Sequence, residues 1–149
     1  MPRYVRCVNV ICVWAALIAP AAAQGLGVRA GASVDPDQFY FGGHAETAPL
    51  LDQLRFRPNI EIGVGNDLTL VAVNFEFAYF LSPAARWSLY AGGGPALNII
   101  NTEAATNSEG GFNLLLGASH AGGLFGEVKV GLLDSPNVKV GVGYTFRWR

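Results

Sequence analysis

The sequence predicts an all-β domain, built as an eight-stranded antiparallel up-and-down β-barrel. Three observations favour this fold. Apolar and polar residues alternate through most of residues 24–149, which is the period expected of strands with two unlike faces. Clusters of Asp, Asn, Ser, Pro and Gly interrupt the alternation at intervals of roughly ten residues, as turns between short strands do. Glycine, which occurs 19 times, interrupts nearly every window that might otherwise form a helix.

The alternation and the turn clusters together delimit eight expected strands. The longest expected connection is a polar loop at residues 101–110, and the other connections are short. Eight strands with short connections fit a meander in which each strand pairs with its neighbours along the chain. The expected strands are residues 25–34, 39–47, 54–65, 69–81, 87–99, 111–120, 124–132 and 138–148.

The third and the last expected strands have the most clearly separated faces. Residues 54–65 place apolar side chains at the even positions and three charged side chains at the odd positions. Residues 138–148 repeat this pattern, with lysine, glycine, threonine and arginine at the odd positions. The sixth strand, residues 111–120, is ambiguous because leucines occupy both of its faces. A barrel with one apolar and one charged face is therefore expected.

Glycine on the polar face indicates that this face lies inside. Glycine weakens a strand surface that faces water, whereas in a narrow barrel it leaves room for long charged side chains that can pair. We therefore expect a polar, Gly-rich interior and an apolar face against lipid, which makes the barrel transmembrane. Glu76 is expected to pair with Arg55 or Arg57 on the neighbouring strand. A soluble lipocalin-like barrel, with the apolar face inward, is the alternative. The expected interior polar network consists of Arg29, Glu46, Arg55, Arg57, Glu61, Glu76, Glu127, Lys129, Lys139 and Arg147.

Aromatic residues gather where the expected strands end. Tyr79 and Phe80 end the fourth strand and Trp87 begins the fifth. Phe146 and Trp148 close the last strand. In an eight-stranded meander these positions fall at one end of the barrel, together with both termini. They are expected to form an aromatic girdle at one membrane boundary.

Residues 1–23 have the pattern of a signal peptide. Arg3 and Arg6 give a positive start, an apolar stretch follows, and Pro20 precedes three alanines that form a small-residue cleavage site. We expect residues 24–149 to form the barrel domain, and a retained membrane anchor is the alternative. Both cysteines lie in the first segment, so no thiol or disulfide chemistry is expected in the barrel.

The end of the chain resembles the C-terminal targeting strand of outer-membrane barrels. Residues 139–146 read KVGVGYTF, and their ending is similar to that of the small OmpA/OmpX-type barrels. The resemblance implies eight strands, Sec export, insertion by the barrel-assembly machinery, and a place in the outer membrane of a Gram-negative envelope, against lipid and lipopolysaccharide. Such chains commonly stop at the final aromatic residue, whereas three residues follow Phe146 here. The resemblance assigns the C-terminal insertion signal to Lys139, Gly141, Tyr144, Phe146 and Trp148.

Candidate chemistry is sparse. Ser119 and His120 are adjacent, so in a strand they face opposite sides and cannot pair as nucleophile and base. Asp35 and Asp37 have the spacing of calcium ligands, but an ordinary turn explains them better. We expect no enzymatic activity, no cofactor and no metal site. A net charge of −1 also gives no basic surface for nucleic acid.

The sequence thus favours a structural or envelope-integrity barrel in the outer membrane. A narrow porin-like barrel or a small-ligand barrel is the second hypothesis. It ranks below a structural role because side chains just fill the interior of an eight-stranded barrel. A lipid A-modifying enzyme and a soluble secreted binding barrel are the remaining alternatives.

Overall fold

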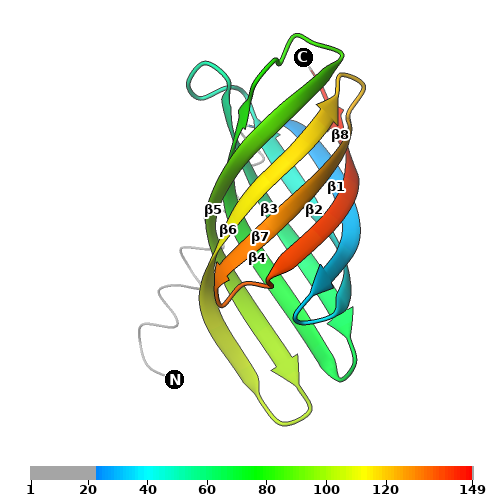
Figure 1. Cartoon of the computed structure of the whole chain (residues 1–149), viewed down its shortest axis with the longest axis vertical. Coiled ribbons are helices and arrows are strands. Elements are labelled where there is room, and N and C mark those ends of the chain that lie inside the picture. Colours follow the sequence, from blue (N-terminus) through cyan, green and yellow to red (C-terminus); the bar gives the residue numbers. More distant parts are fainter. Residues whose placement is uncertain (1–22, 149) are drawn as a thin grey trace.

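A computed structural model describes residues 23–148 and shows a closed barrel of eight antiparallel strands in chain order (Figure 1). The ring is closed by pairing of the last strand with the first. The predicted eight-stranded barrel is therefore confirmed. The predicted signal peptide lies outside the described residues, apart from Ala23. The strands are β1 Ala23–Val34, β2 Gln38–Thr47, β3 Leu54–Gly65, β4 Leu68–Phe80, β5 Trp87–Thr102, β6 Thr106–His120, β7 Leu124–Leu133 and β8 Val138–Arg147.

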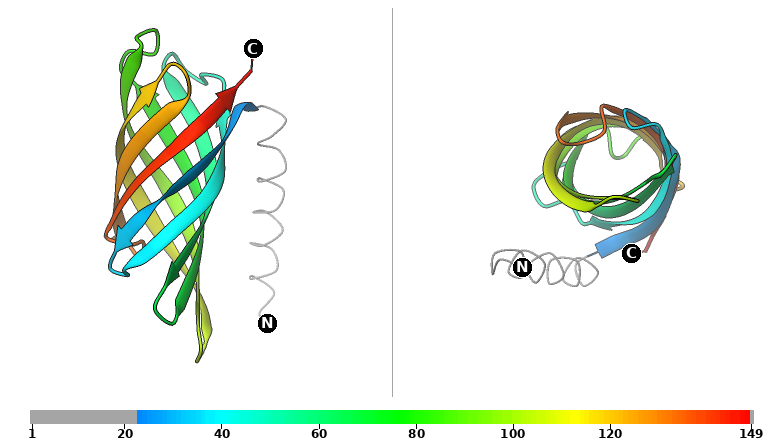
Figure 2. Two further views of the ribbon diagram at one scale, coloured as in Figure 1. Left: turned by 90° about the vertical axis from the view of Figure 1, so that its right-hand side faces the viewer. Right: turned by 90° about the horizontal axis from the view of Figure 1, so that it is seen from below.

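The meander gives the barrel two distinct ends. The start of β1 and the end of β8 lie side by side at one end, which we call the terminal end (Figure 2). The β2–β3, β4–β5 and β6–β7 turns lie at this end as well, and the other four turns lie at the far end. Within residues 23–148 no helix is long and apolar enough to cross a bilayer.

The prediction of a loop at residues 101–110 is wrong. Instead β5 continues to Thr102 and β6 begins at Thr106, so only three residues connect them. The added segment is a hairpin that extends past the rest of the barrel at the far end (Figure 1). Its side chains are polar and mostly exposed on both faces. Alternation does not mark a strand whose two faces both meet water, which is why the sequence pattern missed it.

The two faces of the wall are opposite in character. Large apolar side chains point outward from every strand, with Val28, Leu116 and Val142 each about 60% exposed. Charged and amide side chains point inward and are almost fully buried. In the ambiguous sixth strand, Leu114 and Leu116 point outward and Leu115 points inward. This arrangement is the reverse of a soluble lipocalin-like barrel, which would need the apolar face inside.

Four of the five expected girdle residues lie on the outside. Tyr79, Trp87, Phe146 and Trp148 are each about half exposed near the terminal end. Phe80 is the exception, because its side chain points inward and is 4% exposed. The fold explains this difference, since Phe80 is adjacent to Tyr79 in β4 and adjacent strand residues face opposite sides.

Two prolines interrupt the backbone ladder. The regular pairing of β2 with β3 runs from Gln38–Gly65 to His44–Asn59 and does not continue to the neighbouring Pro58. The pairing of β4 with β5 skips Phe75 and Glu76 and resumes at Phe77–Gly93, just past Pro95 of β5. Proline has no backbone N–H to donate to a ladder. The wall is therefore less regularly bonded around Pro58 and Phe75 than elsewhere.

Close approach of the strands requires glycine at several inward positions. A Cβ atom at Gly92 would overlap the carbonyl oxygen of Phe77, and one at Gly94 would overlap that of Phe75. A Cβ at Gly141 would meet the hydroxyl of Tyr40, whose side chain points inward. These glycines set how near neighbouring backbones and large interior side chains can come.

Replacing Gly92 with Ala is expected to destabilise the barrel by about 1–3 kcal/mol, because β4 and β5 must move apart to admit the methyl group. The measurement is a urea titration of the refolded protein, followed by the gel shift of the unheated sample. Gly110→Ala is the control, since a Cβ there meets nothing within 4 Å. Equal unfolding midpoints for the two variants would contradict the proposed role of Gly92.

Candidate functional site: the charged interior

Glu61, on β3, is the centre of the interior network. Its carboxylate accepts a hydrogen bond of 2.9 Å from the ammonium of Lys129 and one of 2.6 Å from that of Lys139. The guanidinium of Arg29 is 3.4 Å away. All four side chains are at most 4% exposed. A buried carboxylate is unfavourable unless opposite charges surround it, and three bases from three other parts of the ring do so here.

Glu127 and Glu76 extend the network around Lys129. Arg29 donates to Glu127 at 2.7 Å, and the hydroxyl of Tyr90 donates to the same carboxylate at 2.7 Å. Glu76 lies 2.8 Å from the ammonium of Lys129. The expected pairing of Glu76 with Arg55 or Arg57 is therefore wrong. Strand adjacency suggested those arginines, but in a narrow barrel a long lysine from the opposite wall reaches across the interior.

Glu46 forms a second cluster nearer the terminal end. Arg55 donates to its Oε1 at 2.8 Å, and Arg147 donates to the same oxygen at 2.8 Å. The Nε of Arg57 lies 3.4 Å from Oε2. Arg57 also reaches toward Glu127, at 3.6 Å, and so links the two clusters.

All ten residues of the expected interior network lie on the inner face, and each makes at least one ion pair with another member. Of the residues assigned to the insertion signal, Lys139 and Gly141 also face inward. Tyr144, Phe146 and Trp148 face outward, and the rings of Tyr144 and Phe146 lie 4.8 Å apart.

Aromatic side chains also lie in the interior, next to the charged ones. They were not predicted from the sequence. The guanidinium of Arg57 lies between the rings of Tyr90 and Phe125, 4.9 and 4.8 Å from their centroids. The ammonium of Lys139 lies 5.2 Å from the centroid of Tyr40. Such contacts stabilise cations where little water is present. Strand parity contained the signal, since Phe125 shares a face with Glu127 and Lys129.

A row of amides crosses the interior beside the charges. Asn74 donates to Asn59 at 2.8 Å, and Asn113 donates to Asn74 at 2.9 Å. Asn59 then donates to Glu76 at 2.9 Å. The chain of hydrogen bonds thus connects β3, β4 and β6 and leaves the three amides well satisfied, as buried polar groups require.

The arrangement fills the barrel across its width. Within residues 23–148, buried charges, amides and rings contact one another across the interior and together form a bonded plug. His44 is buried against Phe125 and bonds Thr145 at 2.9 Å. The ring of His120 contacts that of Trp87 edge-on, on the other side of its strand from Ser119, as adjacency predicts. Within residues 23–148 no three His, Cys, Asp or Glu side chains converge as a metal site would need.

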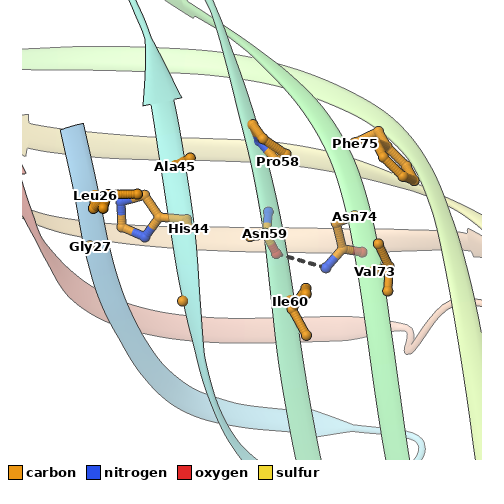
Figure 3. A pocket seen from close by; sticks show the side chains of 11 residues that line it. Leu26, Gly27, His44, Ala45, Pro58, Asn59, Ile60, Val73, Asn74 and Phe75 are labelled. Atoms are coloured by element: carbon orange, nitrogen blue, oxygen red, sulfur yellow. Dashed lines mark hydrogen bonds between the residues drawn. The ribbon is translucent and has the colours of Figure 1, made fainter. Parts of the chain in front are cut away.

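A groove of about 400 Å³ lies on the outer wall over β1 to β4, where the β2–β3 ladder ends (Figure 3). Leu26, Pro58 and Val73 are among its apolar lining residues. The hydrogen bond between Asn74 and Asn59 lies at the inner side of the same stretch of wall (Figure 3). The lining is mostly apolar, but it also includes the inward-facing residues His44, Asn59 and Asn74.

Replacing Glu61 with Gln is expected to cost about 3–5 kcal/mol of folding stability, because Lys129 and Lys139 would remain buried with less opposite charge. Urea unfolding of the refolded barrel measures the cost. A second change, Lys139→Gln, should restore part of it, since the only ion pair of Lys139 within residues 23–148 is with Glu61. Glu103→Gln in an exposed turn is the control. Additive losses in the double variant would show that the pair is not coupled.

Comparisons with known proteins identify the fold. Neither a protein-family model nor a curated protein sequence matches the chain. The crystal structure of Neisserial surface protein A is similar, with a TM-score of 0.68 and 13% identity over 83% of this chain and 95% of that one. The N-terminal β-barrel domain of Pseudomonas aeruginosa OprF is also similar, with a TM-score of 0.57 and 14% identity over 83% of this chain and 98% of the domain. The chain therefore has the eight-stranded barrel fold of these two proteins.

Proposed function

We propose that the chain is a structural barrel of the bacterial outer membrane that contributes to the integrity of the envelope. The observation that carries the proposal is the distribution of side chains on the barrel wall, whose outer face is apolar and whose inner face is charged. An exposed apolar surface that encircles a whole barrel is unfavourable in water and suits hydrocarbon. A closed barrel also leaves no strand edge unpaired, which a bilayer requires.

The plugged interior favours a structural role over transport. Lys129 and Arg29 both pair with Glu61 inside the barrel, and breaking such pairs to admit a solute is costly. A narrow pore or a small-ligand barrel is the second candidate. Both neighbouring structures are of proteins with the same fold, and they support the location by analogy of architecture.

The proposal is tested by fractionation and by planar-bilayer recordings. We expect the protein in the outer-membrane fraction, a gel mobility that changes on heating, and no stepwise conductance.

Val142→Arg should lower folding stability by about 2–4 kcal/mol if the site is near the midplane, because Val142 is exposed on the lipid side of β8.

Ala105→Arg adds the same charge in an exposed turn and is the matched control. A Val142→Arg protein as stable as this control, or folding of the unmodified protein without detergent, would contradict the membrane location. Reproducible single-channel steps would instead favour the narrow pore.

We also propose that β8 carries the signal for insertion by the barrel-assembly machinery. In support, β8 is the strand that closes the ring against β1, and Tyr144, Phe146 and Trp148 project outward at the terminal end. Deleting residues 144–149 should leave the protein in the periplasm, degraded or aggregated. Deleting only 147–149 asks whether Phe146 alone suffices. Wild-type membrane levels after the larger deletion would refute this role.

A further inference from the structure

A pocket of about 340 Å³ opens at the terminal end, between the β4–β5 and β6–β7 turns. Five strands contribute to it, so it is part of the barrel mouth and not of one loop. Unlike the outer-wall groove, it is lined mainly by polar atoms. The lining side chains that matter here are Arg55, Phe80, Ser88, Ser119 and Arg147.

The interior carries surplus positive charge, and the surplus is accessible at this mouth. Within residues 23–148 the interior holds six bases and four acids. Deep in the barrel, bases and acids alternate with nearly every side chain closed off from solvent. At the mouth a single carboxylate, Glu46, forms ion pairs with Arg55 and Arg147 and also with Arg57, which it shares with Glu127. The side chains of Arg55 and Arg147 are 19% and 28% exposed, so both can meet a ligand from outside.

The two exposed guanidiniums are held close together with donors to spare. Both donate to the same oxygen of Glu46, each at 2.8 Å. That is the only hydrogen bond of the Arg55 side chain within the described part of the chain. A guanidinium has five N–H donors, so most of those of Arg55 are free for a ligand. The Arg55 guanidinium also lies over the ring of Phe80, 5.4 Å from its centroid.

Hydroxyls lie beside the guanidiniums. Ser88 and Ser119 face each other on β5 and β6, and Arg147 lies 3.4 Å from the hydroxyl of Ser119. A tetrahedral phosphate has enough acceptor oxygens to bond two guanidiniums and a hydroxyl together, and arginine pairs suit it well. The far end of the barrel has the opposite character, since its turns carry acids and, within residues 23–148, no base.

We propose that this pocket is a binding site for a phosphate group, held by Arg55 and Arg147 with help from Ser119. The phosphate belongs either to a lipid headgroup of the adjacent leaflet or to a soluble molecule on the terminal side. The site goes beyond the structural role proposed above: binding of phosphate requires only the folded barrel, and only the lipid source rests on the proposed membrane location.

The test uses the barrel refolded in an uncharged maltoside detergent, which supplies no competing phosphate. Inorganic phosphate is titrated while backbone and arginine side-chain amide signals are followed by NMR. We expect saturable shifts at Arg55, Ser119 and Arg147 that weaken as ionic strength rises. Arg147→Gln and Arg55→Gln should each reduce the affinity about tenfold, the loss of one charge-assisted hydrogen bond.

Arg86→Gln is the matched control, since Arg86 is exposed at the same end, carries the same charge and does not line the pocket. Arg147→Gln should fold, because one base is removed where bases are in excess, and the unheated gel shift checks this. If neither pocket variant folds, the position of the shifts in the unmodified protein still decides. Shifts absent from the pocket, or equal losses in Arg147→Gln and Arg86→Gln, would overturn the proposal.

A second arm identifies the source of the phosphate. The barrel is placed in nanodiscs of phosphatidylglycerol or of phosphatidylcholine and titrated again with inorganic phosphate. If phosphatidylglycerol already shifts the pocket signals and blocks the titration, the ligand is a lipid headgroup. If inorganic phosphate binds equally in both lipids, the ligand is soluble. Either result supports the site.

Discussion

Four glutamate side chains with almost no exposed surface lie inside this barrel, and a buried carboxylate is stable only when bases and donors surround it. The rest of the structure meets that requirement. Lys129 and Arg29 approach Glu61 from other strands, so the strands must close into a ring for the charges to be neutralised. The closed ring in turn satisfies the backbone of every edge, which allows an apolar exterior.

The interior depends equally on what is missing from it. Gly92 and Gly94 let β4 and β5 approach closely, and Gly141 leaves space for the ring of Tyr40. Long arginine and lysine side chains then cross the interior and stack on aromatic rings, as Arg57 does between Tyr90 and Phe125. Small and large inward residues are thus complementary, and neither set would fill the barrel alone.

Alternation predicted the strands wherever one face is apolar and points outward and the other is polar and faces the interior. It failed for the β5–β6 hairpin, whose outer part is polar on both faces. It also failed for Phe80, which was expected outside with the neighbouring aromatic Tyr79 but points inward. Parity also placed the ten charged residues on one face. It did not predict which of them pair, because Glu76 and Lys129 meet across the barrel and not between neighbouring strands. Pairing across an interior depends on side-chain length and barrel width, which no local pattern records.

The proline breaks make the cylinder mechanically uneven. Next to Pro58 the β2–β3 ladder ends, so fewer backbone bonds share strain there, whereas the β3–β4 ladder continues past Pro58 without a break. When the barrel is compressed from the side, deformation should concentrate where these ladders are interrupted. The cylinder would then change shape mainly at the β2–β3 and β4–β5 seams and least along the uninterrupted pairing of β5 with β6.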